Sequence, residues 1–297
     1  MTQRKKDGKR RKRTAGDYIR LAIFVVALGV FIWSAVQLFT IWREYKVGED
    51  EYDNLAQEFV HTLEEVPTAE TTTAEESISD AAETSVGQGT EETPSGETQG
   101  ETTAPPPPPT EPVRFSVDFD ALKAVNPDNI GWLIMNGTQV NNPVVRGEDN
   151  THYLRYTYLG TWNIAGCLFM DYRNEDEFQS RNAIIYGHNQ KNEKMFGTLQ
   201  AYRDGQFYKS HPVFQMYTPE GVIQYQIFSA YETGAVSESF QIQFADDEAF
   251  QRYLDLIVSR SLYDTGVSVG AGDKILTLST CTDDTVDRFV VHAKRLN

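Results

Sequence analysis

The sequence predicts a mainly β fold, a closed or nearly closed barrel, in the C-terminal part of the chain. Short apolar runs rich in Val, Ile, Phe and Tyr recur between turn residues from residue 131 onwards. In one run Ile223, Tyr225 and Ile227 alternate with glutamines, which is the period of a half-buried strand. A single strong helical stripe, over 246–258, interrupts these runs. Many short strands with few helices are typical of a barrel.

The individual elements follow in order along the predicted domain. A short helix is expected over 118–125, where Asn126-Pro127 stops it, and another near 150–158. An aspartate pair caps the longer helix over 246–258, whose apolar stripe faces the core. The expected strands cover 131–135, 143–145, 166–171, 182–187, 213–217, 221–233, 274–281 and 287–295.

The N-terminus combines a basic cluster with a long apolar segment. Residues 1–20 carry nine Lys or Arg against two Asp, and the uncharged segment 21–42 follows. A helix needs about 20 apolar residues to cross a bilayer core, so this segment is long enough. Basic residues before it and acidic residues after it predict a single-pass anchor with a cytoplasmic N-terminus and an extracellular domain. A cleaved signal peptide is the alternative, but the apolar run is longer than usual and no clear A-x-A site follows.

An acidic segment rich in Thr and Pro separates the anchor from the predicted domain. Residues 47–112 contain 17 Asp or Glu and no Lys or Arg, so they cannot bury enough apolar surface to fold. Weak helical spacing of Tyr52, Leu55 and Phe59 indicates that a helix continues from the membrane. The chain therefore divides into a basic tail (1–20), an anchor (21–42), a disordered stalk that holds the domain off the membrane (43–112) and a folded domain (113–297).

Charge and cysteine content exclude several classes of partner. The net charge of -16 includes +7 on residues 1–20, which leaves -23 elsewhere, whereas nucleic-acid binding needs clustered Lys and Arg. No nucleic-acid partner is therefore expected. No zinc-type Cys/His spacing or EF-hand loop appears, so no metal and no other cofactor is expected. Two cysteines allow one disulfide, or a buried thiol at Cys167 and a reactive one at Cys281; the apolar run around Cys167 favours the second.

A cysteine and an arginine lie at adjoining ends of the last two predicted strands. In 274–281 the leucines share one face, which leaves Thr277, Ser279 and Cys281 on the outer, polar face, with Cys281 at the strand end. Only a turn over 282–286 separates this strand from the next, so the two pair and bring Arg288 near Cys281.

The chain offers two histidines as partners for this cysteine. His188 ends the strand over 182–187, and His292 shares the face of Arg288 and is its rival. A thiolate flanked by cations is a nucleophile for acyl transfer. Each residue alone has an ordinary structural interpretation: an inert buried thiol, a loop histidine and a solvated arginine.

The combination resembles the sortases, the cysteine transpeptidases of Gram-positive cell walls. The carrying motifs are Thr277-Leu278-Ser279-Thr280-Cys281 followed by Arg288, with Tyr186-Gly187-His188-Asn189 upstream. Further segments resemble the class B pattern across residues 113–297: Asn126-Pro127-Asp128, Asn142-Pro143-Val144-Val145, Asp149-Asn150 with Tyr153-Leu154, and Phe169-Met170-Asp171-Tyr172-Arg173. The resemblance implies an eight-stranded sortase-type barrel with short N-terminal helices and one helix before the cysteine strand.

The resemblance also implies roles for named residues. Cys281 is expected to be the nucleophile, His188 the general acid/base and Arg288 the stabiliser of the oxyanion. Asn150, Leu154 and Ser279 match positions that bind the sorting peptide. The implied reaction cleaves a sorting motif after Thr in surface proteins and joins the acyl group to an amine of the peptidoglycan precursor through a thioester. The expected partners are these proteins, that amine and, through residues 21–42, the lipid bilayer.

Three other functions compete with this interpretation. A pilin-polymerising sortase usually carries a lid and a C-terminal membrane segment, and this sequence ends directly after its last predicted strand. An L,D-transpeptidase has its nucleophile in a His-Gly-Cys context, which this sequence lacks around Cys281. A non-catalytic stalked receptor would function without the Cys281 thiol.

Overall fold

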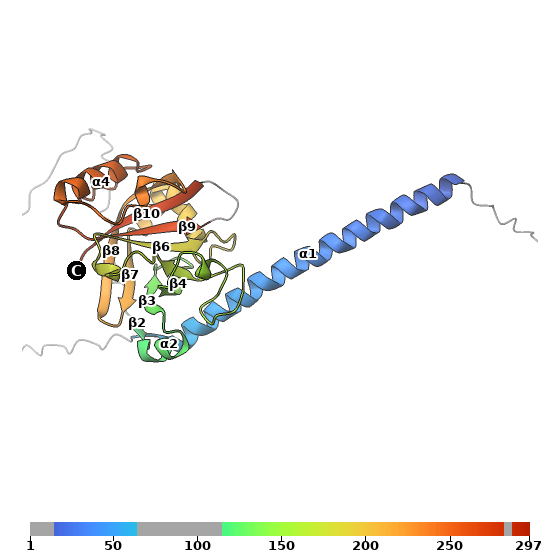
Figure 1. Ribbon diagram of the computed structural model, residues 1–297, viewed down its shortest axis with the longest axis horizontal. Helices are drawn as coiled ribbons and strands as arrows, with labels where there is room; N and C mark the ends of the chain where they lie inside the picture. Colours follow the sequence, from blue (N-terminus) through green and yellow to red (C-terminus); the bar gives the residue numbers. More distant parts are fainter. Residues whose placement is uncertain (1–14, 64–114, 282–286) are drawn as a thin grey trace, which may run out of the picture. The chain divides into compact units, whose positions relative to one another are not determined.

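The computed structural model describes residues 15–63, 115–281 and 287–297 (Figure 1). Most of the predicted basic tail, most of the predicted stalk and the predicted turn over 282–286 lie outside these residues. The strands are β1 (Val60–Thr62), β2 (Phe115–Val117), β3 (Asn129–Ile134), β4 (Asn141–Val145), β5 (Leu168–Met170), β6 (Asn182–His188), β7 (Val213–Thr218), β8 (Gly221–Gly234), β9 (Ile275–Cys281) and β10 (Asp287–Arg295). The helices are α1 (Ala15–Phe59), α2 (Phe119–Val125), α3 (Gly205–Ser210) and α4 (Asp247–Ser259), with 3-10 turns η1 (His152–Leu154), η2 (Glu177–Gln179), η3 (Gly197–Arg203) and η4 (Glu238–Phe240).

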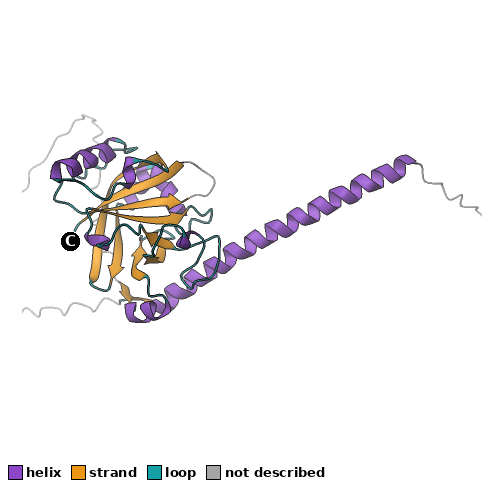
Figure 2. Cartoon of the chain, in the orientation of Figure 1, coloured by secondary structure: helices purple, strands orange, loops and turns teal. Residues whose placement is uncertain are grey.

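Strands β3 to β10 close into a barrel, as the sequence predicts (Figure 2). The order around the barrel is β10-β8-β7-β3-β4-β5-β6-β9. Most neighbours are antiparallel, but β4 with β5 and β6 with β9 are parallel. Because β6 and β9 run in the same direction, their C-terminal residues meet at one end of the barrel.

Two apolar clusters hold the barrel together. One fills its interior and includes Leu276, Leu278 and Phe289. The other lies between the outer face of β8–β10 and α4, whose buried side chains include Phe250 and Leu254. The sequence predicts that Thr277 and Ser279 lie on an outer, polar face of β9, but both are fully buried. A second layer that includes α4 covers the outer face of these strands, and the buried Thr277 hydroxyl donates to the Asn182 side-chain oxygen at 2.7 Å.

Helix α1 extends well beyond its apolar segment and packs on the barrel domain. It is one helix of 45 residues, long and apolar enough to cross a membrane. Its last two turns bury Tyr52, Leu55 and Phe59, the residues whose spacing indicates a helix. The Tyr52 hydroxyl donates to the Gly166 carbonyl at 2.5 Å and accepts from the Tyr158 amide at 3.2 Å. The first part of the predicted stalk is therefore a docked helix.

The two ends of the acidic segment that separates α1 from the barrel lie close together. Strand β1 follows α1 directly and pairs with β2, which begins on the far side of the acidic segment. The Asp118 amide also donates to the Phe59 carbonyl at 3.1 Å. The two ends of the segment thus meet at the domain, and the docked helix α1 sets the separation between the domain and the apolar segment.

The helices near the site are shorter than the sequence predicts. The helix expected over 150–158 is only the turn η1, because the chain reverses at Gly160 (φ 74°) and Tyr156 pairs with Trp162. The short elements η2, η3, η4 and α3, which lie in the connections between strands, were not predicted from the sequence. The helix expected over 246–258 is confirmed as α4, with the Asp246 side chain accepting from the Ala249 amide at 2.7 Å.

Candidate active site

The backbone of the barrel brings the three predicted catalytic positions to one end. In the parallel pair β6–β9, His188 lies opposite Cys281, the last residue of each strand. Strand β10 runs antiparallel to β9, so Arg288, at its start, lies at the same end of the barrel. Residues separated widely in the sequence are thus adjacent because of strand register.

The His188 ring is buried and oriented by a backbone carbonyl. Its Nε2 lies 2.8 Å from the Leu154 carbonyl oxygen in η1. Since a carbonyl can only accept, this contact places a hydrogen on Nε2 and leaves Nδ1 as the nitrogen that can exchange a proton. The turn η1 is itself fixed by Asp149, whose carboxylate accepts from the amides of Thr151 and His152, both at 2.8 Å.

Gly166 packs beside both this carbonyl and the His188 ring. Its φ of 56° lies in the left-handed region, which favours glycine. A Cβ atom built there would lie 2.5 Å from the Tyr153 oxygen, 2.9 Å from the Leu154 oxygen and 3.1 Å from Cδ2 of His188. Only glycine lets the chain pass so close to the histidine.

A cavity of about 240 Å³ opens at this end of the barrel. Asn150, Phe169, Tyr186 and Arg288 are among its lining residues. The Asn150 side chain accepts from the Tyr172 amide at 3.1 Å, which fixes its orientation. The structure thus brings two predicted site residues, Asn150 and Arg288, into one cavity.

The other two predicted substrate contacts are placed differently. Leu154 contacts His188 through its backbone, and its half-buried side chain packs against the barrel core. The Ser279 side chain is fully buried and donates to the neighbouring Thr280 carbonyl at 3.3 Å. Ser279 therefore does not offer its hydroxyl to the cavity.

The ion pair between Asp171 and Arg173 at the cavity wall was not predicted from the sequence. Asp171 is fully buried and accepts from Arg173 Nε at 2.9 Å, from Arg173 Nη2 at 2.6 Å and from the Tyr186 hydroxyl at 3.0 Å. Burial alone would raise the pKa of Asp171, but the hydrogen bonds from Arg173 and Tyr186 outweigh it, and the pKa is lowered. Asp and Arg two residues apart at the end of an apolar strand were the available signal.

His292, the rival histidine, has a structural role. It is fully buried, bonded through Nδ1 to the Thr277 hydroxyl at 2.9 Å and through Nε2 to the Tyr231 hydroxyl at 3.1 Å. Burial, with the nearby charge of Arg260, lowers the pKa of His292 to about 3. The residue is neutral at physiological pH and lies beneath α4.

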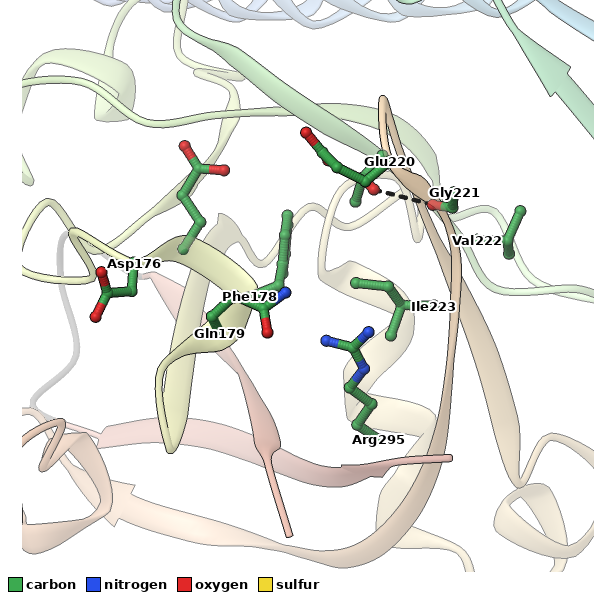
Figure 3. Close-up of a pocket in the computed structure, with 10 residues that line it drawn as sticks. Asp176, Phe178, Gln179, Glu220, Gly221, Val222, Ile223 and Arg295 are labelled. Atoms are coloured by element: carbon green, nitrogen blue, oxygen red, sulfur yellow. Dashed lines mark hydrogen bonds between the residues drawn. The ribbon is translucent and has the colours of Figure 1, made fainter. Parts of the chain in front are cut away.

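A second cavity, of about 330 Å³, lies at the opposite end of the barrel. Figure 3 shows Phe178, Ile223 and Arg295 among its lining residues. Arg295 ends β10 and Ile223 is near the start of β8, whereas Arg288 begins β10. This cavity is therefore separate from the candidate catalytic end.

Comparison with known proteins agrees with the fold. A barrel with a cysteine and a histidine on adjacent strand ends defines a candidate cysteine transpeptidase, and residues 133–296 match the Sortase domain family model. This chain belongs to the sortase family. It is 36% identical over 179 residues to sortase B of Staphylococcus aureus, covering 59% of this chain and 73% of that protein. The resemblance to class B sortases is confirmed.

Solved sortase B structures share the fold. The Staphylococcus aureus sortase B–substrate complex gives a TM-score of 0.58 at 35% identity, covering 60% of this chain and 84% of the other. A sortase B complexed with triglycine gives a TM-score of 0.59 at 35% identity, covering 60% and 85%.

Proposed function

We propose that this sortase is a membrane-anchored class B enzyme that cleaves a sorting motif after Thr and transfers the acyl group to a cell-wall amine. The observation that carries the proposal is the register of β6 and β9, which sets His188 opposite Cys281 at the same barrel end as Arg288. The substrate complex of the related Staphylococcus aureus enzyme supports a peptide substrate.

The first half of the reaction forms a thioester. The Cys281 thiolate attacks the Thr carbonyl carbon, and an S–C bond forms as the carbonyl electrons move to oxygen. Arg288 stabilises this oxyanion with its fixed, permanently charged guanidinium. The oxyanion then collapses, the C–N bond breaks, and protonated His188 gives its Nδ1 proton to the leaving amine.

The second half of the reaction transfers the acyl group. An amine from the peptidoglycan precursor gives a proton to His188 Nδ1 and attacks the thioester carbonyl. A C–N bond forms, the C–S bond breaks, and the Cys281 thiolate is regenerated. The solved sortase B complex with triglycine supports a peptide as the acceptor.

The cavity is the proposed binding site for the sorting peptide. Asn150 and Arg288 line it, and Leu154 contributes through the loop that orients His188. The proposed contacts to the peptide do not include Ser279, because its side chain is fully buried.

Membrane anchoring through residues 21–42 completes the proposal. The length and composition of α1 support a membrane-spanning helix. The nine basic residues within 1–20 support a cytoplasmic N-terminus, since positive charge favours that side.

The test is a cleavage assay with the full-length chain in phospholipid vesicles. Quenched fluorescent peptides of NPxTx, SPxTG, PPxTG and LPxTG type would be offered, with Cys281→Ala and Arg288→Lys as variants. We expect cleavage of one motif after Thr, its loss in Cys281→Ala and a large loss in Arg288→Lys. Added hydroxylamine should trap the acyl group as a hydroxamate. Cleavage that persists in Cys281→Ala would overturn the thioester mechanism, and no cleavage by the parent chain would favour a receptor.

A further inference from the structure

The loop between η1 and β5 forms a tight hairpin that packs along α1. The Thr157 amide donates to the Thr161 carbonyl at 2.9 Å, and the Asn163 amide donates to the Arg155 carbonyl at 2.7 Å. Residues 159–162 at its tip are exposed and carry no charge. They include Leu159, 52% exposed, and Trp162, 54% exposed.

The hairpin contacts α1 at two different heights. Asn163 Nδ2 donates to the Glu44 carbonyl at 3.0 Å, whereas the Leu159 amide donates to the Glu51 carboxylate at 3.1 Å. Glu44 and Glu51 are seven residues apart, which is roughly 10 Å along the helix axis at a rise of about 1.5 Å per residue. The Trp162 end of the hairpin is therefore nearer to the apolar segment than the Leu159 end.

With the apolar segment spanning a bilayer as proposed above, the contact between Asn163 and Glu44 would lie at the depth of the lipid headgroups. The apolar segment ends at Trp42, and Glu44 is two residues, roughly 3 Å, further along the axis. The headgroup layer on each side of a bilayer is roughly 5–8 Å thick. Trp162 directly precedes the residue bound to Glu44, and tryptophan is the side chain that favours this layer.

We propose that Trp162 inserts into the headgroup layer of the outer leaflet of the membrane and holds the catalytic domain against the lipid surface. The inference rests on the membrane anchoring proposed above and adds a second, peripheral membrane contact to it. Gly166, beside the His188 ring, is held by Tyr52, ten residues beyond Trp42. At about 1.5 Å per residue, the candidate active site lies roughly 15 Å beyond the end of the apolar segment.

The experiment measures tryptophan depth with the full-length chain in phosphatidylcholine vesicles. Trp33 and Trp42 in the apolar segment are replaced by Phe, so that the signal comes from Trp162 and from Trp132, which is fully buried in the barrel. Emission is compared in vesicles with and without lipids brominated near the headgroup. Trp162→Phe removes the component of interest. A double variant, Trp162→Phe with Leu159→Trp, instead places the tryptophan at a similarly exposed position of the hairpin that contacts Glu51.

We expect brominated lipid to quench the Trp162 component and to leave the Leu159→Trp component at its unquenched intensity. The Trp132 component should also be unquenched, which reports an intact barrel. Equal emission of Trp162 in both kinds of vesicle would overturn the inference, and so would equal quenching of the two hairpin positions. A chain that does not float with vesicles at all would instead refute the proposed membrane anchoring.

Discussion

Replacing Tyr52 by Phe removes a single hydroxyl from the contact between α1 and the barrel domain. Burial raises the pKa of Tyr52 well above its usual value, so the hydroxyl stays protonated and can donate. It donates to the Gly166 carbonyl and accepts from the Tyr158 amide, and both of these residues are buried. The phenyl ring of the variant keeps the packing but leaves both backbone groups without this partner.

The expected cost follows from those two groups. A buried polar group left without a hydrogen bond costs about 1–3 kcal/mol, so for the two groups together we expect Tyr52→Phe to lower the free energy of unfolding by about 2–6 kcal/mol. Because Gly166 lies beside the His188 ring, where an added Cβ would be 3.1 Å from Cδ2, the variant should also lower kcat for peptide cleavage while changing KM little.

Urea unfolding of the detergent-solubilised chain, followed through the emission of buried Trp132, measures the stability. Tyr45→Phe is the matched control, since it removes a hydroxyl from a half-exposed side chain on the same helix. A change in unfolding free energy within about 0.5 kcal/mol of the parent, the usual range for surface substitutions, would refute the reasoning. An unchanged kcat with reduced stability would show that the helix supports the domain without affecting His188.

Two further predictions concern single buried positions. Gly166→Ala should destabilise the domain and abolish most cleavage, because its Cβ would lie 2.5 Å from the Tyr153 oxygen at a left-handed φ; thermal unfolding and kcat of the variant test this, and a parent-like kcat would contradict it. His292 has a folded pKa of about 3 against an ordinary 6.5, so between these pH values only the unfolded chain binds its proton. The free energy of unfolding should therefore fall as pH drops from 6.5, by up to about 1.4 kcal/mol per pH unit. Urea unfolding at pH 7 and pH 5 should show a smaller fall in His292→Gln than in the parent, and equal falls would count against a buried neutral histidine.

Local patterns predicted most of the barrel. Each of the eight strands carries an apolar run bounded by turn residues, and α4 carries both an N-cap and an apolar stripe. The spacing of apolar residues and the position of turn residues were therefore sufficient to predict these elements. The short elements η2, η3, η4 and α3 carry too few residues to display a period. The spacing of Tyr52, Leu55 and Phe59 indicates which face of α1 is buried. It does not indicate which surface of the domain that face packs against, so the docking of α1 could not be predicted.

The candidate site was only partly predictable for a related reason. Hairpin proximity brought Arg288 near Cys281, but the parallel pairing of β6 with β9 joins strands far apart in the sequence. Ser279 was placed on a polar outer face because alternation does not reveal that a helix covers that face. The catalytic roles of His188, Cys281 and Arg288 remain predictions for the cleavage assay.

The meeting of β1 and β2 has a consequence for proteolysis. A cut anywhere in 64–114 would sever the covalent connection between α1 and the barrel. The buried side chains of Tyr52, Leu55 and Phe59 would still bind the two fragments to each other. Proteolytic cleavage in this segment would therefore give a two-chain sortase whose α1 stays bound to the barrel.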